Sequence, residues 1–253
     1  MSIPARVLPP QLFTVRRPGR LIERSYTVYR RQWWVFVTGF FEPVFYLLSM
    51  EVGFGPLIGE ITANGVTYSY AEFVAPALMA VAAMNGAVFD STIAIFFKLR
   101  QKIYDAMLAT PLTAADVAVG EIGWAIVRGV VYSIAFLVAM LIIGVVGSPL
   151  VILAIPACAL IGFAFAAMGM ALTSYLRSWK DFDYILSVTM PLMLFSGTFY
   201  PASSYGDWSW VVYLSPLYHG VNLTRGFNAG VLVGLSVIGL AATARRIEGL
   251  LLK

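Results

Sequence analysis

The sequence predicts an all-α protein that crosses a membrane several times. Hydrophobic residues make up 60% of the 253-residue chain and charged residues only 12%, whereas soluble domains carry about 25% charged residues. Several apolar runs reach the roughly 20 residues that a helix needs to span a bilayer. The chain lacks the stretches of about ten residues with alternating polarity that are typical of membrane β-barrels. A polytopic helical membrane protein is therefore expected.

The first 32 residues predict a cytoplasmic N-terminal segment that contains an amphipathic helix. They hold seven arginines and no early apolar core, so they do not resemble a cleaved signal peptide. After Pro18-Gly19, apolar and aromatic residues recur at helical spacing, which predicts a helix lying on the inner leaflet. These residues are Ile22, Tyr26, Tyr29 and Trp33. A positively charged anchor and a role in gating both fit this pattern.

Residues 33–253 predict one transmembrane domain of six spans. The expected spans are Trp33–Phe54, Phe73–Phe97, Val117–Val146, Leu150–Tyr175, Tyr184–Phe199 and Gly230–Ala244. The third is longer than a bilayer requires, so it should tilt or project beyond the membrane. Small residues that include Gly162, Ala166 and Gly169 form a stripe on the fourth span, which predicts close helix packing.

The segment 200–229 is too apolar for a free loop and is interrupted by prolines and glycines. Irregular backbone at membrane depth must be buried in protein or line water. We therefore expect two half-inserted or interfacial helices, that is, outer re-entrant helices between spans five and six.

The distribution of Lys and Arg predicts the orientation. The stretches 1–32, 98–116, 176–183 and 245–253 contain 15 of the 17 basic residues. The opposite connections contain only Arg225, and Arg128 lies within the third span. Because positive residues remain on the cytoplasmic side, both termini and the loop 98–116 are expected in the cytoplasm.

No catalytic or metal-binding set emerges from the sequence. The four lysines lie outside any Gly-rich Gly-Lys-Ser/Thr loop, so this chain is not expected to bind or hydrolyse ATP. His219, the only histidine, lacks nearby metal ligands and is read as a hydrogen-bonded polar residue in the outer turn rather than a catalytic one. Cys158 is the only cysteine, so an internal disulfide is excluded.

Four ionisable residues fall within the predicted spans: Glu42, Asp90, Glu121 and Arg128. Placing a charge in hydrocarbon costs at least about 2.5 kcal/mol, so each needs an explanation. In one interpretation they pair within the bundle and hold the helices in register. In the other, Glu42 and Asp90 line a polar translocation path. For any one of these four residues, pairing within the bundle is the favoured interpretation.

The segment Lys98–Glu121 predicts a short helix, a stop and a new helix. Ile103, Met107 and Leu108 can share one helical face, and Thr110-Pro111 should end the turn because the residue before proline avoids helical geometry. Thr113 precedes Asp116 by three residues, as in a capping box. The short amphipathic helix could lie on lipid or insert into a groove of a partner protein. The residues alone do not decide between these.

Five stretches resemble the membrane permeases of type-2 ABC exporters, the family that includes daunorubicin-type and nodulation-factor exporters. They are FEPVFYLLSMEVGFG (41–55), the segment 73–121, SYLRSWKDFDY (174–184), LFSGTFYP (194–201) and SPLYHGVNLTRG (215–226). The resemblance covers nearly the whole chain and is weakest in about the first twenty residues. Glu51 departs from the family, in which Gly is common at this position.

The resemblance implies a six-helix permease that dimerises with a second copy or a homologous permease. It also implies two ABC ATPase subunits on separate chains, which would bind ATP and Mg²⁺, while this chain binds no cofactor. The loop around Tyr104–Leu112 is then a coupling helix that docks on the ATPase, with Lys102, Tyr104, Asp105, Met107, Leu108 and Pro111 as candidate contacts. Candidate pathway residues are Glu42, Asp90, Phe195, Phe199 and Tyr200.

The function expected on this basis is ATP-driven export of an amphipathic drug, lipid or glycolipid across the inner (plasma) membrane. Membrane lipids are expected to contact the chain, and nucleic acid is not an expected partner. An ion- or proton-coupled secondary transporter using Glu42, Asp90 and Glu121 is the alternative, although no inverted repeat supports it. An integral membrane enzyme is disfavoured because no nucleophile or metal set is present.

Overall fold

The computed structural model describes residues 16–31, 34–63, 66–146, 149–176 and 178–225, and these are mostly helical. Three continuous helices are long and apolar enough to cross a membrane: Tyr70–Arg100, Ala115–Ile143 and Val151–Thr173. They correspond to the predicted spans two, three and four. The first consists of α4 (Tyr70–Phe89), a π-helical turn η3 (Asp90–Ala94) and α5 (Ile95–Arg100).

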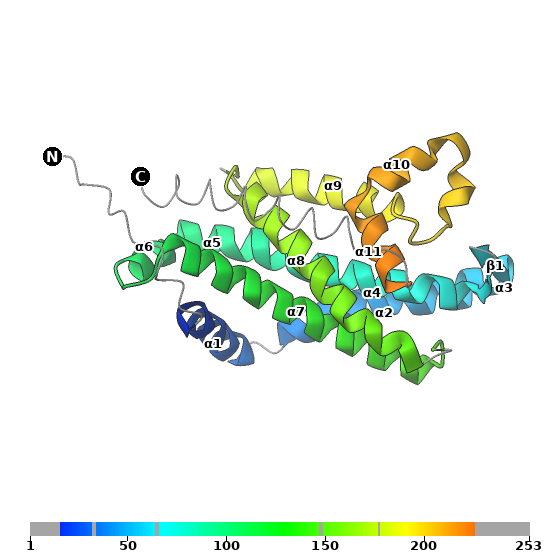
Figure 1. Cartoon of the computed structure of the whole chain (residues 1–253), viewed down its shortest axis with the longest axis horizontal. Helices are drawn as coiled ribbons and strands as arrows, with labels where there is room; N and C mark the ends of the chain where they lie inside the picture. The colour runs from blue at the N-terminus through cyan, green and yellow to red at the C-terminus, as the bar shows by residue number, and fades with distance from the viewer. Residues whose placement is uncertain (1–15, 32–33, 64–65, 147–148, 177, 226–253) are drawn as a thin grey trace.

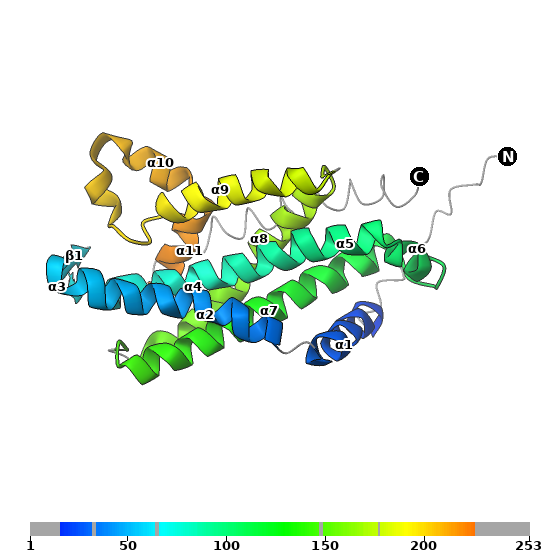
Figure 2. The ribbon, with the colours of Figure 1, turned by 180° about the vertical axis from the view of Figure 1, so that it is seen from behind.

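The core of the bundle lies where α4, α7 (Ala114–Ile143) and α8 (Ala154–Thr173) pack against one another. Alanine, methionine and other apolar side chains of α4 are almost completely buried there. Figures 1 and 2 show α4, α7 and α8 running along the length of the molecule. A 3₁₀ turn, η4 (Pro149–Leu153), leads into α8.

Of the other predicted spans, the first is a continuous helix, the fifth is shorter than predicted, and the sixth lies outside the described residues. The first corresponds to α2 (Trp34–Ser49), which continues through a π-helical turn η2 (Met50–Phe54) into α3 (Gly55–Ile58). The fifth corresponds to α9 (Phe182–Leu194), which ends five residues before the predicted Phe199. The sixth, Gly230–Ala244, lies outside the described residues. The total of six membrane spans therefore stays a prediction.

A small β-hairpin is the main departure from the all-α prediction. Strands β1 (Glu60–Ala63) and β2 (Val66–Ser69) pair antiparallel, with Ala63 opposite Val66. Ser69 then caps α4: its hydroxyl accepts from the Glu72 N–H, and the Glu72 carboxylate accepts from the Ser69 N–H at 2.9 Å. We call this end of the bundle the hairpin end.

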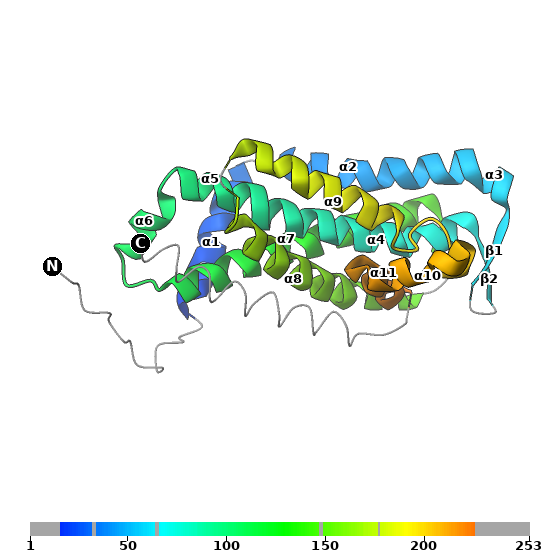
Figure 3. The same cartoon turned by 90° about the horizontal axis from the view of Figure 1, so that it is seen from above.

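Short helices occupy both ends of the bundle (Figure 3). α6 (Ile103–Leu108) connects α5 to α7 and lies at the end opposite the hairpin, which we call the loop end. After α9, the chain forms η6 (Ala202–Trp208), α10 (Ser209–Leu214) and α11 (Pro216–Thr224), and α11 packs on α4 and α8. The predicted segment 200–229 is therefore helical in its described part.

The N-terminal helix α1 (Arg16–Arg31) lies across the loop-end half of α7 (Figure 1). The remaining element is a 3₁₀ turn, η5 (Trp179–Asp181), which precedes α9. The predicted amphipathic helix is thus present, and it begins before Pro18 rather than after Gly19.

The π-helical turn η3 packs directly against α8. A Cβ atom added at Gly169 would lie 2.0 Å from Ser91 Oγ and 3.1 Å from Ser91 Cβ. Thr173 donates a hydrogen bond of 2.7 Å to the Ser91 carbonyl. The predicted close packing of the small residues on this helix is confirmed at Gly169, where the lack of a side chain leaves room for Ser91.

Substituting Gly169 by alanine should therefore lower the thermal stability of the protein in detergent. We expect a loss of about 1–3 kcal/mol, the usual range for overpacking. Ser91→Ala combined with Gly169→Ala should recover part of it, because the closest atom is removed. Gly53→Ala is the control, since nothing lies within 4 Å of its added Cβ. Equal melting temperatures for Gly169→Ala and Gly53→Ala would contradict the packing argument.

Candidate functional site: the loop end and the buried ion pairs

The loop between α5 and α7 folds as the sequence predicts. Lys102 adopts a left-handed conformation that separates α5 from α6, and the Thr110 hydroxyl closes the end of α6 with a 2.5 Å bond to the Met107 carbonyl. Thr113 and Asp116 form the predicted capping box at the start of α7. The short helix, stop and new helix are confirmed.

The candidate docking residues divide between the surface and the interior. Lys102, Asp105 and Pro111 are exposed, and Leu108 is partly buried. Tyr104 and Met107 are buried against the bundle. In this conformation an external partner would therefore meet the polar side of α6 and Pro111, while Tyr104 and Met107 fix α6 to the chain itself.

An ion pair attaches α5 to α7 close to this loop. Lys98 Nζ lies 2.6 Å from Glu121 Oε2, and the carboxylate is almost fully buried. The buried Tyr104 hydroxyl has no hydrogen-bond partner among the described residues. Burial first, and then the charge of Glu121, raises the pKa of Tyr104 well above its ordinary value, so the phenol stays neutral.

A second and deeper ion pair joins α7 to the π-helical turn. Asp90 and Arg128 are 4% and 3% exposed, and Arg128 Nη1 donates to Asp90 Oδ1. The Arg128 guanidinium also donates to the Tyr132 hydroxyl from Nε and Nη2, at 3.0 and 2.8 Å. The Tyr29 hydroxyl donates to Asp90 Oδ1 at 3.3 Å. We call these four residues the Asp90 cluster.

Helix α1 approaches α7 through two glycines. Added Cβ atoms at Gly120 and Gly123 would lie 2.8 Å from Leu21 and 2.9 Å from Ile22. About two turns further along α1, the Tyr29 ring packs on Trp124 with centroids 5.2 Å apart. Burial and the neighbouring Asp90 raise the pKa of Tyr29 above its ordinary value, so its hydroxyl remains a hydrogen-bond donor.

The same helix also reaches the loop. Arg24 Nη1 lies 4.0 Å from the sulfur of Met107 on α6. The helix α1 therefore contacts both α6 and Asp90, and the Lys98–Glu121 ion pair joins α5 to α7 beside the same loop.

Comparison with known proteins identifies the family of the chain. Residues 19–227 match the family model described as ABC-2 type transporter, a membrane component. That range covers most of the chain. The chain belongs to the ABC-2 type transporter family.

Relatives of this ABC-2 protein include several proteins named Nodulation protein J. The one from Sinorhizobium fredii (strain NBRC 101917 / NGR234) is 31% identical over 187 residues, covering 73% of this chain and 70% of the relative. The one from Rhizobium meliloti (strain 1021) is 29% identical over 209 residues, covering 80% and 78%. The relative from Azorhizobium caulinodans is 25% identical over 233 residues, covering 86% and 89%.

The predicted pathway residues of this ABC-2 protein do not form one group in the structure. Asp90 is buried in its ion pair, whereas Glu42 on α2 is exposed. Phe195, Phe199 and Tyr200 follow the end of α9, and only Phe199 is buried. Their role in translocation stays a prediction.

Other chemistry is sparse in the described part of the ABC-2 protein. No group of three His, Cys, Asp or Glu side chains that could hold a metal ion occurs there. His219 Nε2 lies 2.9 Å from the Tyr213 carbonyl oxygen, as expected for a hydrogen-bonded polar residue.

Sequence reasoning did not find the partners of the buried charges. It identified Asp90, Glu121 and Arg128, but not the pairing of Asp90 with Arg128, of Glu121 with Lys98, or the contact with Tyr29. Glycines at 120 and 123 were the available signal, because two small residues three apart mark a helix face that another helix can approach closely.

Removing one member of the Asp90–Arg128 pair should cost more stability than removing both. Asp90→Asn or Arg128→Met alone leaves an uncompensated buried charge or an unsatisfied partner, with an expected loss of about 3–5 kcal/mol. The double variant should recover much of this loss. Thermal unfolding of the purified protein in detergent measures it. Additive losses in the double variant would show that the two residues do not stabilise each other.

Proposed function

We propose that this ABC-2 membrane subunit is the permease of an ATP-driven exporter that moves an amphipathic drug, lipid or glycolipid-type cargo out of the cell. A separate nucleotide-binding subunit, present in two copies per complex, binds ATP and Mg²⁺ and supplies the energy. The observation that carries this proposal is the membership of residues 19–227 in the ABC-2 family. The similarity to proteins named Nodulation protein J supports the family assignment and does not define the cargo.

In this proposal α6 is the coupling helix. Closure of the two ATPase subunits would push on the exposed surface formed by Lys102, Asp105 and Pro111. The buried Tyr104 and Met107 would transfer the displacement to the bundle, α1 would follow through Arg24, and the Asp90 cluster would change its geometry. The spans would then rearrange and open a path between two permease halves, with Glu42, Asp90, Phe195, Phe199 and Tyr200 as candidate pathway residues.

The membrane topology is also part of the proposal. Six spans, with the sixth at Gly230–Ala244, place both termini and α6 in the cytoplasm and the hairpin end outside. The concentration of Lys and Arg in the connections on one side supports this orientation. The complex is a homodimer, or a heterodimer with a homologous permease, in the inner (plasma) membrane.

Charge reversal on the exposed side of α6 should disrupt docking without disturbing the fold. Lys102→Glu with Asp105→Lys changes two exposed side chains, so we expect normal membrane insertion and melting temperature but at least tenfold less ATPase subunit in co-purification. Glu60→Lys on the exposed hairpin is the matched control and should retain the partner. Normal co-purification and cargo-stimulated ATP hydrolysis in the α6 variant would contradict the docking assignment.

The source of energy for transport distinguishes an ATP-driven exporter from the alternative, an ion- or proton-coupled secondary transporter. In that alternative Glu42, Asp90 and Glu121 carry the coupling. In vesicles that contain the permease and its ATPase, transport of a fluorescent lipid should require ATP. It should continue when a protonophore abolishes the proton gradient, because the conformational work comes from the nucleotide-binding subunits. Transport that continues without ATP and stops with the protonophore would favour the alternative.

A further inference from the structure

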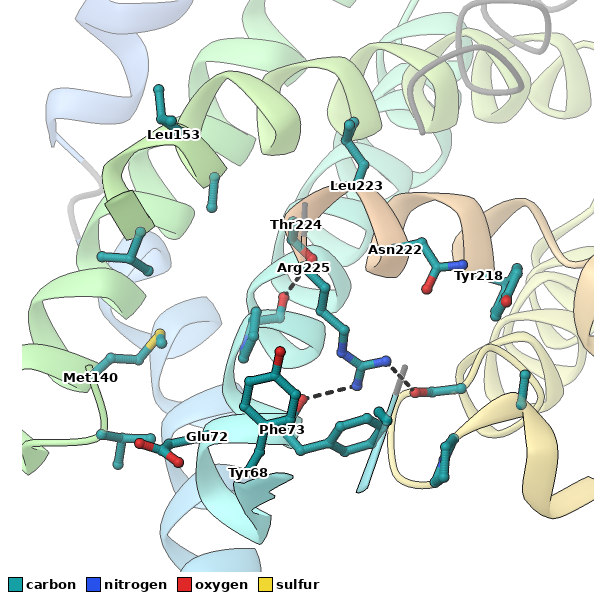
Figure 4. A pocket seen from close by; sticks show the side chains of 18 of the residues that line it. Tyr68, Glu72, Phe73, Met140, Leu153, Tyr218, Asn222, Leu223, Thr224 and Arg225 are labelled. Atoms are coloured by element: carbon teal, nitrogen blue, oxygen red, sulfur yellow. Dashed lines mark hydrogen bonds between the residues drawn. The ribbon is translucent and has the colours of Figure 1, made fainter. Parts of the chain in front are cut away.

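A cavity of about 730 Å³ opens at the hairpin end, far from α6 along the bundle. Its walls come from the β-hairpin, the start of α4, the end of α7, the start of α8, the turn after α9, and α11. Its size is in the range that accommodates a small molecule. Figure 4 shows the side chains that line it.

One wall of the cavity contains a partly buried cation, Arg225. Its guanidinium extends from the end of α11 toward Phe73 and lies over that ring, 3.8 Å from the centroid (Figure 4). Nη1 donates to the Gly197 carbonyl at 3.0 Å, and Nη2 donates to the Phe73 carbonyl at 2.9 Å. Nε is buried and has no hydrogen-bond partner in the described part of the chain. Arg225 therefore has an unused donor.

No acidic side chain among the described residues neutralises the charge of Arg225. Twelve of the thirteen carboxylate side chains belong to described residues, and none of these forms an ion pair with Arg225. The remaining acid, Glu248, is separated from it in the sequence by the predicted sixth span. Neutral carbonyl groups and a ring face hold this guanidinium, whereas buried charges in proteins are usually paired with an opposite charge.

The rest of the cavity is amphipathic. Tyr218, Asn222 and Arg225 lie at i, i+4 and i+7 on α11 and all line it. Tyr68 and Phe73 add aromatic rings, and the far wall is apolar, formed by Met140, Val145, Val146, Val151 and Leu153. Glu72 also lines the cavity, but its Oε2 accepts from the Ser69 N–H in the capping box. The geometry combines a cationic, hydrogen-bonding side with an apolar side.

We propose that this cavity binds an amphiphile with one anionic oxygen-bearing head group, of the phosphate or carboxylate class. The head group offsets the charge of the Arg225 guanidinium, which lines the cavity, and Tyr218 and Asn222 provide hydrogen bonds. The hydrocarbon part lies along the apolar residues at the end of α7, in the connection after it and in η4. A charge-assisted hydrogen bond in a site of low dielectric is stronger than the same contact in water.

This inference rests on the proposed function in one respect, the source of the ligand. The ligand is either the exported cargo or a lipid of the membrane leaflet at the hairpin end. Binding itself requires neither ATP nor transport. The test is therefore made on the permease–ATPase complex without nucleotide, in a neutral maltoside detergent. Binding can fail while ATP-driven export holds, and it can succeed in a protein that does not export.

The probe is dodecyl phosphate, with dodecanol as the same chain without charge and inorganic phosphate as the head group alone. Native mass spectrometry counts bound ligands, and titration of the intrinsic fluorescence gives apparent affinities. We expect one dodecyl phosphate per permease, bound at least tenfold more tightly than either comparison compound. Equal affinity for dodecanol would overturn the anionic assignment, and equal affinity for inorganic phosphate would overturn the assignment to an amphiphile.

A matched pair at Asn222 tests the location without removing the contacts of Arg225. Asn222→Asp places a carboxylate of the same size on the cavity face of α11, so it should weaken dodecyl phosphate binding at least tenfold. Asn222→Ala, which adds no charge, should weaken it by no more than about fivefold, the scale of one neutral hydrogen bond of about 1 kcal/mol. Arg225→Gln should abolish the preference for the charged ligand if the variant folds. Unchanged binding by a folded Asn222→Asp protein would overturn the proposal.

Discussion

The buried Asp90–Arg128 ion pair is the contact on which the arrangement of the loop-end half depends. It joins the π-helical turn of the 70–100 helix to the middle of α7, in surroundings that are otherwise apolar. Neither charge is tolerable there alone, so the two helices must keep the register that brings them together. Tyr132 completes the guanidinium's hydrogen bonds, and Tyr29 extends the constraint to α1.

The π-helical turn explains why this constraint is local rather than spread along the helix. An extra residue in one turn changes which side chains face the neighbours, and such turns are frequent at functional sites. In this π-helical turn, Asp90 faces α7, where it pairs with Arg128. The next residue, Ser91, lies close to Gly169 and Thr173 of α8. One irregular turn thus contacts two of its neighbouring helices. A motion that straightened it would have to break an ion pair and a tight backbone contact together.

Sequence reasoning predicted the elements better than their contacts. The capping box at Thr113, the stop at Thr110-Pro111 and the three long helices follow from local rules, and the structure confirms them. The hairpin was missed although Asn64-Gly65 is a favoured two-residue hairpin connection, because its strands are only four residues long. The burial of Tyr104 and Met107 could not be foreseen, since an amphipathic helix does not reveal whether its apolar face meets its own bundle or another protein.

Arg128 and Arg225 show how the same side chain can have different roles. Arg128 is neutralised by Asp90 and also bonded to Tyr132, so it has little capacity for another ligand. Arg225 is held by carbonyl groups of two distant segments, and no carboxylate among the described residues pairs with it. A purely structural arginine at that position would gain by having a carboxylate partner, as Arg128 does. Among the described residues Arg225 has no carboxylate partner, so its positive charge acts on a cavity large enough for a small molecule. The hairpin end therefore holds an unpaired cation, whereas the described charges inside the loop end are paired.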